Sequence, residues 1–117
     1  MPHIQRKLLT SNKSNPDLER LTLINAESGS GYLEVGEVTI APGKKIPMHI
    51  HQTHEEGIYI MDGPLDYVLG DQSGTALAGE VILAPARIKH EITNNSTEAR
   101  RIMFIFPTTN VHREFVE

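Results

Sequence analysis

Histidine and glutamate residues gather at one point of this chain. Three of its six histidines, His49, His51 and His54, lie within six residues, and Glu55 and Glu56 follow directly. Side chains two positions apart on a β-strand point to the same face, so the imidazoles of His49 and His51 can reach one ion at about 2.0–2.2 Å. A turn after them can bring a carboxylate from the next strand to the same ion. The pattern therefore predicts a metal site made of imidazole and carboxylate groups.

The composition of the 117 residues excludes several other kinds of site. There is no cysteine, which excludes a disulfide framework, a thiolate zinc site, an iron–sulfur cluster and a cysteine nucleophile. The formal net charge is −4 and the basic residues are scattered, so we expect no nucleic-acid partner. No apolar run approaches the roughly 20 residues that cross a bilayer, and residues 1–7 lack an apolar signal segment. We therefore expect a cytoplasmic protein without a membrane partner.

Short apolar segments with a period close to two recur along the chain, separated by glycine, proline, asparagine or aspartate. Such spacing predicts an all-β sandwich or barrel. The predicted strands are 18–24, 32–40, 47–52, 57–61, 65–69, 75–78, 81–84, 88–93 and 101–106. Short helices are plausible only at 15–19 and at the far C-terminus. Because no linker or internal repeat interrupts the pattern, we predict a single domain over residues 1–117.

Two segments combine these elements into longer motifs. The first, residues 43–63, contains Gly43, five residues, His49-x-His51, four residues, Glu56, six residues and Gly63. The second, residues 79–94, contains Gly79, Pro85, His90 and Asn94. In these two motifs the chain resembles the cupin superfamily, and in particular its small single-domain, cupin-2-like members. The one departure is Arg87, where the family usually has glycine.

The resemblance implies a double-stranded β-helix, or jelly-roll barrel, with one divalent transition metal near its centre. The ligands that it implies are His49, His51, Glu56 and His90. Iron, manganese, nickel, cobalt, copper or zinc can occupy such a set, and the residue types alone do not select among them. Some members of the family keep the barrel without the metal, and there the histidines are satisfied by hydrogen bonds.

Glu55 is the alternative carboxylate ligand, because the family tolerates a spacing shorter by one residue. We prefer Glu56, since an inward-facing Glu56 also directs Ile58 and Ile60 into the barrel. Glu55 then lies at the rim or in solvent.

Three neutral imidazoles and one carboxylate leave a divalent ion with about one positive charge and up to two open positions. Such an ion favours a small, possibly anionic substrate with oxygen ligands. Dioxygenase-type chemistry is the first expectation, followed by a Lewis-acid isomerase, hydrolase or decarboxylase. The third alternative is a barrel that binds or senses a sugar or an anion without turnover. The catalytic acid or base is unknown, because no residue outside the ligand set stands out.

Two further residues are candidates for substrate contact. We expect His54 at the mouth of the pocket or on the surface. At Arg87 the family glycine often has a positive φ, which costs another residue about 1 kcal/mol or more, so we expect a different turn there. The alternative is that the Arg87 guanidinium reaches the barrel mouth and holds a carboxylate or phosphate. His3 and His112 lie outside the motifs, and we expect no role for them.

The same alternation predicts an apolar outer face. If the ligands face inward, the outward side chains on 47–52 and 57–61 include Met48, Ile50, Tyr59 and Met61. An apolar sheet face is usually covered. We therefore expect a homodimer that packs these faces together, with cover by the N-terminal strand of the same chain as the alternative.

Overall fold

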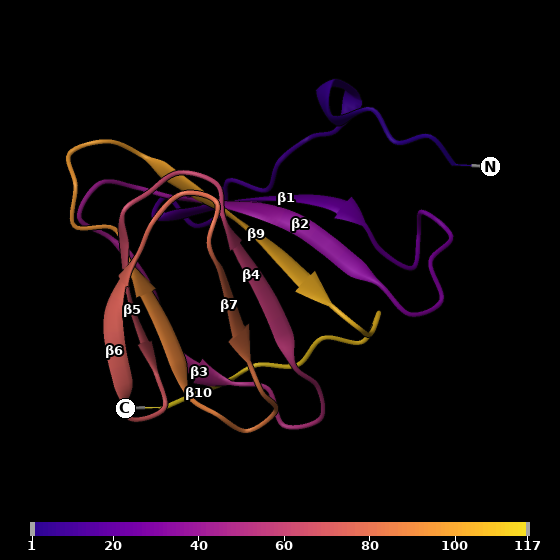
Figure 1. Cartoon of the computed structure of the whole chain (residues 1–117). Helices are drawn as coiled ribbons and strands as arrows, with labels where there is room; N and C mark the ends of the chain where they lie inside the picture. The colour runs from indigo at the N-terminus through magenta and orange to yellow at the C-terminus, as the bar shows by residue number, and fades with distance from the viewer. Residues whose placement is uncertain (1, 117) are drawn as a thin grey trace.

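The computed structural model describes residues 2–116, which form two antiparallel sheets of five strands each (Figure 1). The first sheet has the order β1 (Leu18–Ile24), β2 (Glu34–Ile40), β9 (Arg100–Phe106), β4 (Glu56–Ile60) and β7 (Val81–Ala84). The second has the order β10 (Glu114–Phe115), β3 (Lys45–Ile50), β8 (His90–Thr93), β5 (Leu65–Leu69) and β6 (Gln72–Ala76). The predicted all-β, jelly-roll class is confirmed. Among the described residues no helix is long and apolar enough to cross a bilayer.

Strand prediction is accurate where the alternation is clean. β1, β5 and β7 begin and end at the predicted residues. β6 begins three residues earlier than expected, because β5 and β6 are joined by a tight turn at Gly70-Asp71, with Leu69 opposite Gln72. In that turn Gly70 has a φ of 59°, a conformation that glycine adopts without strain.

Both predicted helices are wrong. The segment after Asn15 is a turn, in which the Asn15 side chain accepts a hydrogen bond from the Asp17 N–H, and β1 begins at Leu18. Asparagine commonly competes with helix formation in this way. Near the C-terminus Glu114 and Phe115 form β10, which pairs with β3. The only helical segment among residues 2–116 is a 3₁₀ turn, η1 (Arg6–Leu8).

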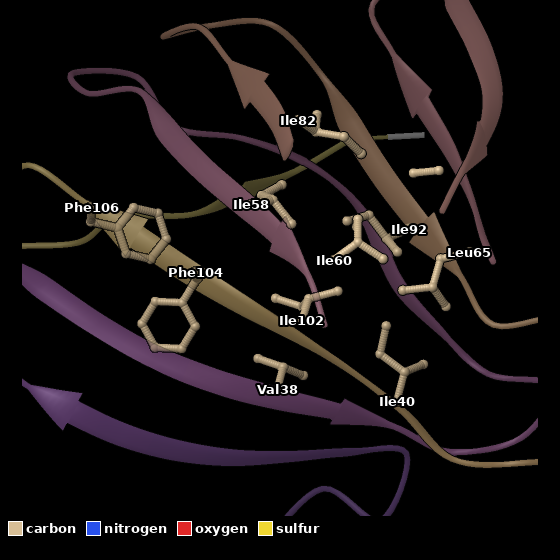
Figure 2. Close-up of a cluster of buried hydrophobic side chains, with 11 residues drawn as sticks. Val38, Ile40, Ile58, Ile60, Leu65, Ile82, Ile92, Ile102, Phe104 and Phe106 are labelled. Carbon is tan, nitrogen blue, oxygen red and sulfur yellow. The ribbon is translucent and has the colours of Figure 1, made fainter. Parts of the chain in front are cut away.

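The hydrophobic core lies between the two sheets. Buried residues alternate with more exposed ones along β4, β7 and most of β9, as expected for strands with one face on a core. Figure 2 shows the result: Phe104 and Phe106 of β9 lie at one end of the cluster, and Ile40 and Leu65 lie at the other. The interior therefore has an aromatic end and an aliphatic end.

The first residue of one motif and the last residue of the other are tied together. Gly43 has a φ of 74° and donates its N–H to the Asn94 carbonyl, while the Asn94 N–H donates to the Lys44 carbonyl. Asn94 is completely buried, and its side-chain amide donates to the carbonyls of Ile40 and Glu98. Asn94 is thus a structural residue that fixes the loops at one end of the barrel.

Arg87 retains the backbone conformation of the glycine that it replaces. Its φ is 67°, the only positive value for a non-glycine residue between 2 and 116. Its N–H donates to the His51 carbonyl. Our expectation of a different turn was therefore wrong: this hydrogen bond holds the left-handed conformation despite its cost for a residue with a Cβ.

A bulge in β3 sets the direction of its side chains. Ile46 lies opposite Ile92 and His49 lies opposite His90, so β3 has one extra residue between these two pairs. Without the bulge, residues three apart would point to opposite faces. With it, Ile46 packs against the core and His49 is buried as well.

The predicted apolar outer row does not exist as one surface. β3 belongs to the second sheet and β4 to the first, so Met48 and Ile50 lie on a different sheet from Tyr59 and Met61 (Figure 1). A sequence-based parity argument cannot detect this, because it assumes that successive strands pair. The outer face of the first sheet carries the exposed apolar side chains instead: Tyr59, Val81, Leu83 and Ile105.

Candidate metal centre

Four side chains from both sheets converge inside the barrel. His49 lies on β3 and His90 begins β8, both in the second sheet, and His51 directly follows β3. Glu56 begins β4 in the first sheet. All four side chains are buried, and one potential ligand atom from each lies within 4.8 Å of those from the others. Two donors at about 2.1 Å from a common ion are at most about 4.2 Å apart, so the cluster is close to the span of a coordination sphere.

The orientation of each imidazole is set by a backbone carbonyl. Nδ1 of His49 lies 2.7 Å from the Pro47 oxygen, within the β3 bulge. Nδ1 of His90 lies 3.0 Å from the Ile88 oxygen, and Nδ1 of His51 lies 2.6 Å from the His112 oxygen. A carbonyl oxygen only accepts hydrogen bonds, so each Nδ1 is assigned as the donor. Nε2 of each ring is then free to act as a metal ligand, the arrangement typical of ligating histidines.

The interior side of the cluster contains more acceptors than donors. Oε1 of Glu56 lies 3.1 Å from Nε2 of His51 and 3.0 Å from Nε2 of His90. In neutral rings whose Nδ1 carries the proton, both of these nitrogens have lone pairs that face an oxygen with lone pairs. Such contacts are favourable only with a positive charge between them, either a proton or a metal ion. The donor set therefore fits a cation.

The pKa values of two members agree with a site that is ready for a cation. Burial by itself raises the pKa of the Glu56 carboxyl, but the imidazoles of His51 and His90, when their Nε2 atoms carry a proton, outweigh it through hydrogen bonds and positive charge and lower this pKa to about 2. Burial lowers the pKa of His49 to about 4, because its imidazolium form loses solvation. Near neutral pH the Glu56 carboxylate is therefore charged and the His49 imidazole is neutral.

Aromatic rings cover one side of the cluster. The Phe106 ring contacts the rings of His51 and His54 edge-on, with centroids 5.1 and 5.2 Å away. The rings of His51 and His54 are stacked at 4.7 Å. His54 is thus buried within the aromatic end of the core rather than exposed on the surface. It also lines a shallow hollow with Pro85 and Pro107.

The structure distinguishes between the candidates that the sequence left open. Glu56 points into the cluster, whereas its neighbour Glu55 is exposed. Arg87 is also exposed. His3 and the imidazole of His112 lie outside the cluster, as expected. The His112 main chain nevertheless has a role, because its carbonyl orients His51.

A hollow of about 410 Å³ opens beside His49, and sequence reasoning missed two of its residues. They are Arg20 of β1 and Arg113, which lies just before β10. Arg20 has the same parity as Leu18, which packs against the core, and this was a usable signal that it faces inward. Burial, followed by the nearby charge of Arg113, lowers the pKa of Arg20. No signal in the sequence indicates that Arg113 lies near Arg20.

Comparisons with known proteins agree with this architecture. A family described as "Cupin domain" matches residues 36–113. Polyketide synthase CurC of Streptomyces cyaneus is 26% identical over 85% of this chain and 64% of its own length. Quercetin 2,3-dioxygenase of Bacillus subtilis is 23% identical over 77% of this chain and 27% of its own length. The chain therefore spans less than two thirds of these two relatives.

This chain covers a larger share of one protein of known structure. The polyketide cyclase RemF from Streptomyces resistomycificus superposes with a TM-score of 0.86, covering 100% of this chain and 86% of that protein, at 20% identity. At this identity the similarity shows the fold and not the reaction. The fold agrees with the family match, which covers most of this chain. The chain therefore belongs to the cupin family.

Proposed function

We propose that this protein is a metal-dependent enzyme. In this proposal one divalent transition-metal ion is held by Nε2 of the three histidines and by the Glu56 carboxylate, and a small substrate binds beside it through oxygen atoms. The observation that carries the proposal is the orientation of the rings of His49, His51 and His90. Backbone carbonyls fix all three so that their lone pairs converge on a buried, charged carboxylate.

The chain's own residues have three roles in such an enzyme. The carbonyls of Pro47, Ile88 and His112 hold the rings in one tautomer. Phe106 excludes water from one side of the cluster. The hollow beside His49 provides a route for a substrate. A bound divalent ion supplies a Lewis acid and, when the ion is redox-active, one-electron chemistry.

Lewis-acid chemistry on an oxygen-rich substrate is the reaction class that we favour. We favour it because this chain covers a larger share of the polyketide cyclase RemF and of polyketide synthase CurC, neither of which is named as an oxygenase, than of the dioxygenase. In sequence analysis we placed dioxygenase chemistry first. It becomes the second candidate, supported by the similarity to quercetin 2,3-dioxygenase.

Metal content of paired variants tests the proposed centre. Glu56→Gln and His90→Ala should lower the bound metal of the purified protein, measured by elemental analysis, from about one equivalent to near zero. Glu55→Gln and His3→Ala alter exposed side chains of the same types and should retain the metal. Metal that survives in Glu56→Gln and is lost in Glu55→Gln would show that the assigned register is wrong.

Oxygen consumption separates the two reaction classes. Wild-type protein reconstituted with Fe²⁺ should show no more O₂ uptake with a catechol or β-diketone than the His90→Ala variant shows. O₂ uptake that needs both the substrate and the intact site would reverse our order of the two reaction classes and favour the dioxygenase.

We retain the expectation of a small-molecule substrate, and a cytoplasmic location remains a prediction.

We also propose that the protein forms a homodimer through the outer face of the first sheet. Val81, Leu83, Tyr59 and Ile105 are 38–62% exposed there. Glu37 on the same face is already paired with Arg6. A largely uncharged apolar face can pack against its own copy about a two-fold axis.

One glutamate on this face tests the dimer. Leu83→Glu should convert a dimer to a monomer in sedimentation analysis, because pairing would bury the new charge. Leu77→Glu alters a similarly exposed leucine outside the strands and should leave the dimer intact. A wild-type monomer at micromolar concentration contradicts the proposal.

A further inference from the structure

The hollow beside His49 lies where the two sheets end. β1 is an edge strand of the first sheet and β10 an edge strand of the second, and both contribute residues to its wall. Leu18, Ile46 and Phe115 provide apolar surface. Arg20 and Arg113 provide two guanidinium groups in the same wall. The hollow thus combines two positive charges, an apolar surface and one imidazole of the candidate metal centre.

Neither guanidinium forms an ion pair with an acidic residue among residues 2–116, and the negative charges of Glu34 and Glu56 act on Arg20 only from a greater distance. The side chains of Arg20 and Arg113 form no hydrogen bond and no ion pair there, and their only specific contacts are with aromatic rings. The guanidinium carbon of Arg20 lies 5.1 Å from the centre of the Phe104 ring. That of Arg113 lies 5.9 Å from the centre of the Phe106 ring. These contacts position the two cations but leave their hydrogen-bond donors unused.

Other arginines of the chain show the contrast. Arg6 forms two hydrogen bonds with Glu37, and Arg101 is paired with Asp62. Arg20 is partly buried, so its unused donors have lost part of their contact with water. The desolvated, positively charged donors of Arg20 favour an anion that can restore their hydrogen bonds, and the exposed Arg113 adds a second positive charge.

We propose that this hollow binds an organic anion, with a carboxylate held by Arg20 and Arg113 and an apolar body against Leu18, Ile46 and Phe115. The end of the molecule nearest His49 faces the ion of the proposed metal centre, and only this part of the inference rests on the proposed function. Guanidinium groups suit the role because each presents several N–H donors in a planar array that matches a carboxylate. Arg87, for which the sequence offered anion binding as the alternative interpretation, does not line this hollow.

Binding of benzoate, compared with its neutral analogue benzamide, tests the charge requirement. Both probes have the same flat apolar ring, but only benzoate carries the negative charge. Isothermal titration calorimetry on metal-free protein should show benzoate binding at least ~10-fold more tightly than benzamide, since a charge-assisted hydrogen bond exceeds the energy of one decade in affinity. Equal affinities for the two probes overturn the proposal.

Variants of the two arginines test the location. Arg20→Gln and Arg113→Gln should each weaken benzoate binding about 10-fold or more and leave benzamide binding unchanged. Arg87→Gln, at an exposed arginine outside the hollow, should bind benzoate like the wild type. Wild-type affinity in both hollow variants, or equal loss in Arg87→Gln, overturns the proposal.

Two controls separate this inference from folding defects and from the metal proposal. Circular dichroism checks the fold of each variant. If Arg20→Gln does not fold, Arg20→Lys keeps the charge without the planar array and should still bind benzoate more weakly than the wild type. Metal content of Arg20→Gln or Arg113→Gln should equal that of the wild type. A wild type that binds benzoate but no metal would refute the proposed function alone, and one that binds metal but not benzoate would refute this inference alone.

Discussion

Two buried carboxylates of the first sheet lie on opposite faces and have different partners. Glu37 of β2 faces outward and is 4% exposed, while Glu56 of β4 faces inward and is 6% exposed. Arg6 donates two hydrogen bonds of 2.8 and 2.9 Å to Glu37. Among residues 2–116 Glu56 has no arginine or lysine partner and faces two imidazole nitrogens. The chain supplies a permanent cation for one carboxylate and not for the other.

This difference explains why one carboxylate is structural and the other is a ligand candidate. Removing a carboxylate from water is costly unless a positive charge compensates it. The Arg6 guanidinium is charged under all ordinary conditions, so Glu37 needs no proton or metal ion from solution to compensate its charge. The imidazoles of His51 and His90 carry no permanent charge, and Glu56 therefore depends on a proton or a bound ion.

The largest expected effect concerns stabilisation by metal. A divalent ion that binds only the folded wild type should raise its free energy of unfolding by about 2.7 kcal/mol at about 100 times the dissociation constant. In Glu56→Gln this gain should be close to zero, and in Glu37→Gln it should match the wild type. Urea unfolding with and without the ion measures all three. If the ion raised the free energy of unfolding of Glu56→Gln as much as that of the wild type, Glu56 would not be a metal ligand, and the proposed difference between Glu37 and Glu56 would be wrong.

A smaller effect is expected in metal-free protein. The amide of Glu56→Gln can donate a hydrogen bond to an imidazole lone pair, which the carboxylate cannot do. At alkaline pH, where protonated imidazoles no longer favour the charged carboxylate, we expect this variant to be as stable as the metal-free wild type or more stable by about 1 kcal/mol. Urea unfolding in the presence of a chelator measures the difference. A clear loss of stability would mean that protonated histidines already compensate Glu56.

The smallest effect is the acid dependence of the outer carboxylate. The Arg6 hydrogen bonds lower the pKa of Glu37 below its ordinary value of 4.5, against the opposing effect of burial. Because the folded-state pKa is the lower one, the stabilisation is complete above the ordinary value and is lost as the pH falls through the folded value. Solvent screens the half-exposed Arg6 and keeps the effect modest.

Glu37→Gln removes this titration. Between about pH 5 and about pH 3 the free energy of unfolding should fall less steeply in the variant than in the wild type, both measured without metal. Lys7→Ala, next to Arg6 but without an ion pair, should retain the wild-type slope. Identical slopes in the wild type and Glu37→Gln would show that the outer pair contributes nothing to the acid dependence.

The sequence by itself determined nine of the ten strands, and its resemblance to the cupin superfamily implied the four members of the cluster. Alternation is a local property, so β1, β5 and β7 could be predicted to the residue. The His49-x-His51 spacing indicated which face of that strand points inward. The parity of Ile58 and Ile60 favoured Glu56 over Glu55 as the inward carboxylate. Neither inference needs knowledge of which strands pair. The two predicted helices failed because a local asparagine turn and a long-range pairing with β3 prevailed over weak helical signals.

Only the tertiary structure decided which distant segments meet. The separation of β3 and β4 into different sheets divided the predicted apolar row. The bulge before His49 and the carbonyl of His112 aim the imidazoles, and each depends on contacts between distant strands. Arg20 and Arg113 come together from the two ends of the chain. Side-chain parity is set within a strand, whereas these contacts depend on how the whole chain folds, and a single sequence contains no local signal for that.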